Sequence, residues 1–178
     1  MPLTKLNNQS LSAVTAAGIP IRSGSVLQVI SVDKKDVFDL TSNETTFTDV
    51  TGLSVQITPS ATTSKILVTG AVVGSAVSHY FCARLMRDNT QILVPDSIGN
   101  RIPSNFGSST YQGGNYMSFT NPIHALDSPA STSLLTYKIQ IRAYTGGVYV
   151  NKTPRDENNA AGYDPRGCSS ITVMEIAG

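Results

Sequence analysis

The sequence predicts an all-β protein: an antiparallel β-sandwich, jelly-roll-like, that follows a short N-terminal arm. Residues 53–58 and 135–142 alternate between apolar and polar side chains, as half-buried strands do. About ten short strand-like runs, separated by turn residues, follow one another along the chain at spacings typical of sandwiches and jelly rolls. The 14 Gly and 9 Pro, with Ser and Thr at about a fifth of the chain, favour short strands over helices.

The first 22 residues differ from the rest of the chain. A short helix from Ser10 to Ala17 fits them, with Ser10 as N-cap and Gly18 as the stop, and an extended arm fits them equally well. Because their apolar residues complete no strand pattern, we expect residues 1–22 to dock on a partner and residues 23–178 to form the sandwich domain. The expected docking residues are Leu3, Leu6, Leu11, Val14, Ile19 and Ile21.

Six strands are expected in the first half of the domain. Leu53, Val55 and Ile57 share one face of the third strand, while the fourth is apolar on both faces and is expected to be covered. The turn pair Asp88-Asn89 joins the last two strands as a hairpin. The expected ranges are 25–32, 37–40, 53–58, 65–73, 80–87 and 91–94, and a long Gly-, Pro- and Ser-rich loop follows over 95–115.

The second half repeats the pattern, with strands expected over 116–125, 135–144, 148–150 and 170–176. Thr145-Gly146-Gly147 predicts a hairpin turn between the second and third of these strands. The final strand is apolar on both faces, which places it in the middle of a sheet. A polar loop over 151–167 is expected before it.

Composition excludes several classes of function. The formal net charge is +1 and charged residues make up 14% of the chain, so nothing steers the protein toward nucleic acid or an anionic membrane. The chain has no apolar stretch long enough to span a bilayer, and its first residues lack the core of a secretory signal. Cys82 and Cys168 form no ligand motif and are interpreted as two buried thiols.

The sequence contains no recognisable catalytic constellation. The two histidines, His79 and His124, are isolated on strands, where a structural role is commoner than catalysis. Asp127 and Glu175 are of the type that glycosidases pair, but no sequence feature brings them together. We therefore expect no catalytic residues, no cofactor and no metal site, and we do not expect an enzyme.

The charged loop over 151–167 has two interpretations. In the first, Arg155 and Arg166 pair locally with Asp156 and Asp164 in a solvated loop. In the second, the loop is a recognition surface at one end of the sandwich, where loops gather. Its recognition residues would be Arg155, Asp156, Tyr163 and Arg166.

Several motifs resemble a module of marine phage and cyanophage virion proteins. They include Gly24-Ser25-Val26-Leu27-Gln28-Val29, the run from Thr46 to Pro59, Leu126-Asp127-Ser128-Pro129-Ala130, Val148-Tyr149-Val150-Asn151 and the ending Ser170-Ile171-Thr172-Val173-Met174-Glu175-Ile176. Their order matches the family over about residues 23–178. The family resembles trimeric fibre tips and capsid decoration proteins, both built as jelly-roll-like sandwiches.

The resemblance implies a virion structural protein, made in the host cytoplasm, whose partners are copies of itself in a homotrimer and the major capsid protein or another virion protein. Tail-fibre proteins usually carry a long adaptor before such a module, whereas about twenty residues precede it here. The first hypothesis is therefore a capsid decoration or cement protein. The second is a tail-fibre tip that binds a host cell-surface glycan or protein. A glycan-cleaving enzyme is a third, less favoured hypothesis.

Overall fold

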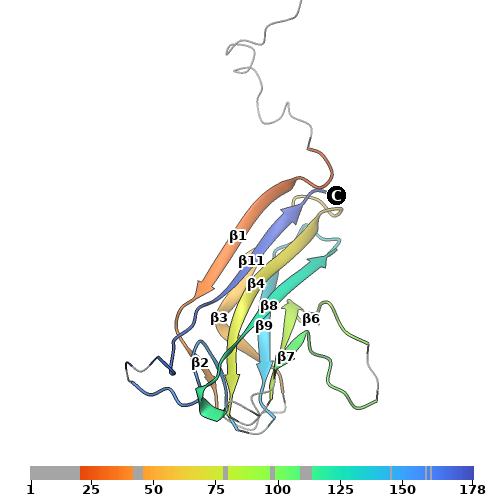
Figure 1. Cartoon of the computed structure of the whole chain (residues 1–178). Coiled ribbons are helices and arrows are strands. Elements are labelled where there is room, and N and C mark those ends of the chain that lie inside the picture. Colours follow the sequence, from red (N-terminus) through yellow and green to blue (C-terminus); the bar gives the residue numbers. More distant parts are fainter. Residues whose placement is uncertain are drawn as a thin grey trace, which may run out of the picture.

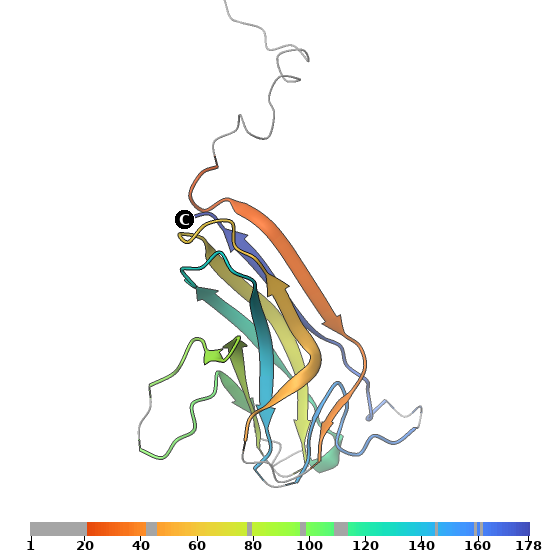
Figure 2. The same ribbon diagram turned by 180° about the vertical axis from the view of Figure 1, so that it is seen from behind.

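Two antiparallel sheets pack face to face in the structure, a computed structural model (Figure 1, and Figure 2 from behind). The structure describes residues 21–41, 46–77, 80–96, 99–108, 114–144, 146–158, 160 and 162–178. The strands are β1 (Val26–Lys34), β2 (Phe38–Leu40), β3 (Thr48–Ile57), β4 (Lys65–Ala76), β5 (Phe81–Arg87), β6 (Thr90–Gln91), β7 (Phe106–Ser108), β8 (Phe119–Asp127), β9 (Leu135–Arg142), β10 (Val148–Val150) and β11 (Ser169–Ile176). One 3-10 turn, η2 (Gly114–Tyr116), precedes β8. None of the described residues belongs to a helix of the length and apolarity that a membrane crossing requires.

Sheet A contains β1, β2, β4, β8, β10 and β11. β11 pairs with β4 from Lys65 to Ala71, and β10 pairs with the next stretch of β4 from Gly74 to Ala76. β10 and β11 therefore lie in line as one interrupted strand, and the same holds for β2 and β1, which pair with them on the other side. β8 pairs with the free side of β4.

Sheet B has the order β3-β9-β5, with β6 and β7 pairing with successive stretches of the outer side of β5. Strands that lie in line are counted as one strand position along the chain. The first position then pairs with the last (β1 with β11), and the second pairs with the second-last (β3 with β9). The third pairs with the third-last (β4 with β8), and the two middle positions pair with each other. This nested pairing is the jelly-roll arrangement, so the predicted fold class is confirmed.

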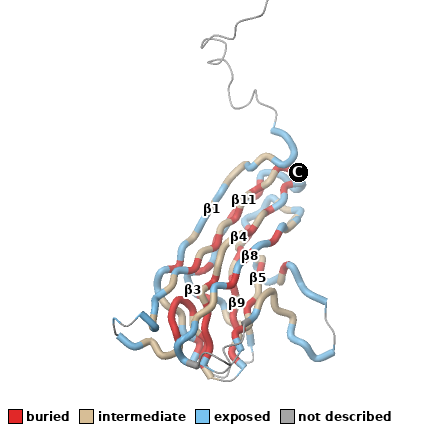
Figure 3. Tube along the Cα trace, in the orientation of Figure 1, coloured by how far each residue is buried: buried red, intermediate tan, exposed pale blue. Residues whose placement is uncertain are grey.

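The core lies between the sheets, where buried positions alternate with exposed ones along each strand (Figure 3). Leu53, Val55 and Ile57 of β3 are all buried, as their alternation predicted. They share the core with apolar side chains from the facing strands of both sheets, including Ile66, Val68, Val72, Tyr137, Ile139, Ile141, Ile171 and Val173.

Most expected strands are confirmed, with shifts at their ends. The final strand is central, because β11 lies between β1 and β4. The expected loop over 95–115 contains a strand, β7, which pairs with β5. β8 begins at Phe119 after the η2 turn, three residues later than expected.

The interpretation of the two cysteines as buried thiols is wrong for Cys168 and holds only in part for Cys82. Both thiols are free, Cys82 is half-buried on β5, and Cys168 is exposed just before β11. Burial raises the pKa of the Cys82 thiol. The core is filled by aliphatic and aromatic side chains instead.

Candidate interaction surfaces

The segment 151–168 interrupts the line from β10 to β11, and Asn151 holds its two ends together. The Asn151 backbone has φ +67°, and its Nδ2 donates hydrogen bonds to the carbonyl oxygens of Lys34 and Asp36, both at 2.8 Å. Its Oδ1 accepts a 2.6 Å bond from Ser169 Oγ, and its carbonyl accepts one from Gly167 N. The segment therefore leaves and re-enters the sheet at a rigid junction.

Arg155 organises the first part of this segment. Its guanidinium carbon lies 4.9 Å and 5.0 Å from the ring centres of Tyr116 and Tyr163, which contact each other edge to face. Arg155 also forms ion pairs with Glu157 and with the buried carboxylate of Asp164. The hydrogen bond with Glu157 is the main cause that raises the pKa of the Arg155 guanidinium.

Asp156 is the second centre of charge, where it pairs with Arg166 at 2.7 Å and Lys152 at 3.3 Å. The predicted local pairing of the loop charges is therefore confirmed, although each arginine takes the aspartate more distant from it in the sequence. A polar cleft of about 460 Å³ opens here, lined by Asp156, Glu157, Asn158, Asp164 and Arg166. The role of these residues in recognition stays a prediction.

The two arginines of the loop are expected to differ in their effect on folding. Arg166→Ala removes an exposed ion pair and changes the free energy of unfolding by about 0–1 kcal/mol. Arg155→Ala removes the packing between Tyr116 and Tyr163, so we expect a melting temperature lower by at least about 3 °C. Thermal unfolding of the two variants side by side measures the difference, and equal melting temperatures would show that Arg155 has no packing role.

The two ends of the domain lie at the end of the sandwich opposite to segment 151–168 (Figure 1). Gly24 N donates to the carbonyl of Ala177, and Ala177 N donates to that of Ser25, each at 2.8 Å. Of the expected docking residues, only Ile21 is among the described residues, and it is 68% exposed. Leu3, Leu6, Leu11, Val14 and Ile19 lie outside the described residues.

The outer face of sheet A carries almost no charge. The strand register places Val29, Met174, Leu67 and Leu126 side by side in one apolar row across four strands. The next rows are Ser31, Thr172, Thr69 and His124, then Asp33, Ser170, Ala71 and Pro122. Asp33 is the only formally charged residue of these three rows, and Val29 and Leu126 at the ends of the apolar row are 56% and 57% exposed.

The outer face of sheet B is polar and bonded to itself. Lys138 Nζ pairs with Asp49 at 2.7 Å, and Gln140 Nε2 donates to the same carboxylate. Arg84 Nε in turn donates to Gln140 Oε1 at 2.8 Å and stacks on Phe47. The two faces of the sandwich therefore differ in kind: four polar residues of sheet B, Asp49, Arg84, Lys138 and Gln140, bond to one another, while the face of sheet A offers apolar and hydroxyl groups.

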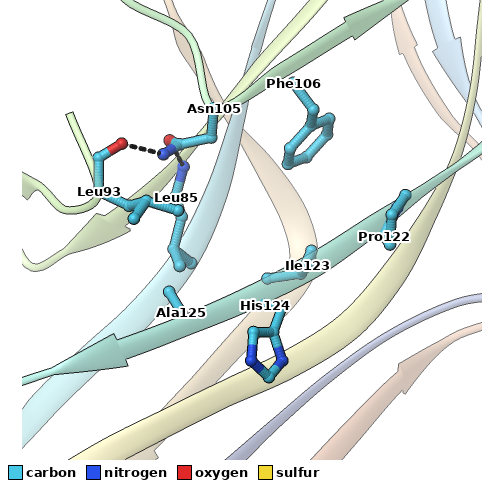
Figure 4. A pocket seen from close by; sticks show the side chains of 8 residues that line it. All are labelled: Leu85, Leu93, Asn105, Phe106, Pro122, Ile123, His124 and Ala125. Carbon is cyan, nitrogen blue, oxygen red and sulfur yellow. Dashed lines mark hydrogen bonds between the residues drawn. The ribbon is translucent and has the colours of Figure 1, made fainter. Parts of the chain in front are cut away.

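A small apolar groove of about 150 Å³ lies beside β8 (Figure 4). It is lined by Leu85, Leu93, Asn105, Phe106, Pro122, Ile123, His124 and Ala125. Asn105 holds together the backbone along one side of the groove. The Asn105 Oδ1 accepts a hydrogen bond from Leu85 N at 2.7 Å, and the Asn105 Nδ2 donates to the carbonyls of Ile92 and Leu93. His124 is exposed on β8, and His79 lies outside the described residues.

Asp127 and Glu175 share one row of sheet A, on either side of Ile66. Two strand spacings of about 4.8 Å separate their backbones. Asp127 accepts hydrogen bonds from Tyr137 OH and Arg87, and Glu175 accepts them from Ser60, Ser64 and Gln28. Both carboxylates are thus committed to structural bonds. Among the described residues, no cluster of His, Cys, Asp and Glu is suited to hold a metal ion.

No family model and no curated protein matches this chain. Three of the similar solved structures are the VP2 subviral particle of infectious bursal disease virus, a T=1 particle derived from infectious bursal virus, and the Gx strain of infectious bursal disease virus. They are 11%, 13% and 12% identical to this chain, each with a TM-score of 0.39, and each covers 87% of it. The chain spans 42%, 37% and 43% of their respective lengths. Likenesses this distant show neither a family nor a function.

Proposed function

We propose that this chain is a structural subunit of a bacteriophage virion that assembles with copies of itself. The leading form is a homotrimeric capsid decoration or cement protein that stabilises the head by binding the capsid shell. The alternative is a tail-fibre tip that binds a host receptor through segment 151–168.

The contrast between the two outer faces of the sandwich carries this proposal. Four strands at about 4.8 Å spacing and a twelve-residue β4 give sheet A a face of roughly 700 Å², close to the ~800 Å² that each partner buries in a standard interface. An apolar row that crosses the whole sheet and an almost uncharged surround suit burial against protein. In a structural protein, such a face is commonly covered by another copy of the same chain.

The jelly-roll pairing and the ordered sequence motifs support a virion rather than an enzyme. Jelly rolls build viral capsid proteins as well as lectins and cupins, so the fold alone does not decide the function. The space between the sheets is filled by buried aliphatic and aromatic side chains, including Leu53, Val68 and Tyr137. Among the described residues, these side chains occupy the space in which a catalytic cavity within a sandwich would lie.

The features at the two opposite ends of the sandwich fit both forms of the proposal. The described chain begins at Ile21, close to the end where Gly24 meets Ala177, so attachment through the N-terminal side would leave the opposite end outward. Segment 151–168 lies at that opposite end, with Tyr116 and Tyr163 exposed beside the polar cleft. These exposed rings favour the fibre-tip alternative, because aromatic side chains are common in recognition surfaces.

Leu67→Lys tests the use of sheet A. We expect light scattering coupled to size exclusion to show that the natural protein is a trimer at micromolar concentration. Leu67→Lys should be largely monomeric, because it places a charge in the apolar row that the trimer would bury. Gln56→Lys, on the exposed outer face of sheet B, is the matched control and should stay trimeric. A natural protein that is monomeric at this concentration contradicts self-association through this face.

The copy number in the virion separates the two forms of the proposal. Hundreds of copies per particle would support a capsid protein, whereas a few tens or fewer would support a tail protein. A cryo-EM map of the virion that locates the chain answers the same question directly.

A further inference from the structure

A shallow pocket of about 370 Å³ lies on the outer face of sheet B and shares no lining residue with the cleft of segment 151–168 or with the groove beside β8. It is lined by Tyr80, Cys82, Ile102 and Tyr144. Cys82 is on β5, Tyr80 immediately precedes that strand, and Tyr144 lies just after β9. The two tyrosine rings meet edge to face with centres 6.0 Å apart, and the residues are 54% and 59% exposed.

Arg142, the last residue of β9, is not itself a lining residue of this pocket but neighbours two residues that are. It is the direct cross-strand partner of Cys82 and lies two residues before Tyr144, so strand alternation puts Arg142, Cys82 and Tyr144 on one face. Directly opposed residues of two antiparallel strands, such as Cys82 and Arg142, have Cα atoms about 4.5–5.5 Å apart, well within the reach of an arginine side chain.

The charge of Arg142 is not compensated by any described residue. Its Nε is buried and has no hydrogen-bond partner, one of two such side-chain atoms among the described residues. The neighbouring cations of the same face are all engaged, Arg84 by Gln140 and Lys138 by Asp49. A buried N–H group without a partner is costly, and in a native protein it calls for a missing ligand, ion or water.

We propose that this pocket binds an anionic saccharide, a sugar ring that carries a carboxylate. The planar guanidinium of Arg142 presents two parallel N–H groups to a carboxylate, a pairing stronger and more directional than a neutral hydrogen bond. Tyr80 and Tyr144 supply apolar area for the C–H face of the ring. The volume is in the range of small-ligand sites, in which a few polar groups orient a largely apolar contact.

The position of the pocket in the sheet favours a sugar over an acidic peptide. Extended peptides gain most of their affinity from backbone hydrogen bonds to a free strand edge. β9 is paired with β3 and β5 on its two sides, and β5 with β9 and with β6 and β7. A ligand on this face therefore contacts side chains only, as a sugar ring does. The inference does not depend on the trimer or on attachment to a capsid.

The test is an NMR titration of the full chain with three probes: D-glucuronate, D-glucose, which lacks only the carboxylate, and acetate, which lacks the ring. We expect glucuronate to bind in the millimolar range with shifts at Tyr80 and Tyr144, and glucose and acetate to bind at least tenfold more weakly. Arg142→Ala should weaken glucuronate at least tenfold, and Arg142→Lys by less, because it keeps the charge but loses the fork. Tyr144→Ala should also weaken binding.

Arg22→Ala is the control, since it removes an equal charge from an exposed position before β1 and should leave binding unchanged. Thermal unfolding of each variant confirms that it is folded. Equal binding of glucose and glucuronate, or of acetate and glucuronate, overturns the proposal, and so does unchanged binding by a folded Arg142→Ala. Shifts produced by a short poly-glutamate peptide but not by glucuronate would assign the pocket to acidic peptides and refute the sugar.

Discussion

Glu175→Gln is expected to lower the free energy of unfolding at pH 7 by about 3 kcal/mol. Glu175 is 1% exposed and faces the interior at the end of β11. One of its carboxylate oxygens accepts hydrogen bonds from Ser60 N, Ser60 Oγ and Ser64 Oγ, and the other accepts one from Gln28 Nε2, all at 2.6 Å. Glutamine removes the negative charge that strengthens these hydrogen bonds, and its amide N–H group would face other hydrogen-bond donors. Urea unfolding measures the loss.

The same carboxylate should make stability depend on pH. Burial alone raises its pKa, but the hydrogen bonds from Ser60, Ser64 and Gln28 outweigh burial and lower the pKa from 4.5 to about 2. A folded-state pKa below that of the unfolded chain gives stability that is present above pH 4.5 and is lost as the pH falls toward 2. The difference between the natural protein and Glu175→Gln should therefore shrink over this interval.

Glu157→Gln is the matched control for this prediction. The same chemical change is made there at an exposed carboxylate, whose ion pair with Arg155 lies at the surface. We expect a change of less than about 1 kcal/mol. Equal stability of Glu175→Gln and the natural protein from pH 7 down to pH 2 would contradict a structural role for the buried carboxylate.

Strand alternation allowed much of the fold to be predicted, because burial on one face imposes a period of two. Leu135, Tyr137, Ile139 and Ile141 are all buried, as their spacing indicates. The same signal was present for Glu175, which follows Ile171 and Val173 on the core face, although a carboxylate there was not interpreted as a buried one. β7 was missed because Phe106–Ser108 lies in a Gly- and Ser-rich stretch that has no alternation.

The candidate sites were harder to predict, because they depend on contacts between residues distant in the sequence. The loop charges were correctly expected to pair with each other, but nothing near Arg155 in the sequence indicates that Tyr116 packs on it. Arg142 looks like any polar position of an alternating strand. Its significance appears only when Gln140, Lys138 and Asp49 are seen to bond with one another and leave the buried Nε of Arg142 without a hydrogen-bond partner.

Asn151→Ala is expected to destabilise the protein by about 3 kcal/mol and to loosen segment 151–168. The side chain is buried and makes three hydrogen bonds: to the carbonyl of Lys34 at the end of β1, to that of Asp36 in the following turn, and from Ser169 Oγ. Alanine leaves these buried groups without partners, at a cost of about 1–3 kcal/mol. It must also adopt φ +67°, which asparagine tolerates better than alanine.

Urea unfolding and amide hydrogen exchange separate the two effects of this substitution. Asn151→Gly keeps the backbone conformation free of strain, so it should recover about 1 kcal/mol relative to alanine, while the hydrogen bonds stay lost. The Gly167 amide, which donates to the Asn151 carbonyl, should exchange faster in both variants. Asn158→Ala, at an exposed position of the same segment, should match the natural protein in both measurements. If Gly167 stays protected in a stable Asn151→Ala, the junction is held by β10 and β11 alone, and Asn151 does not position the loop.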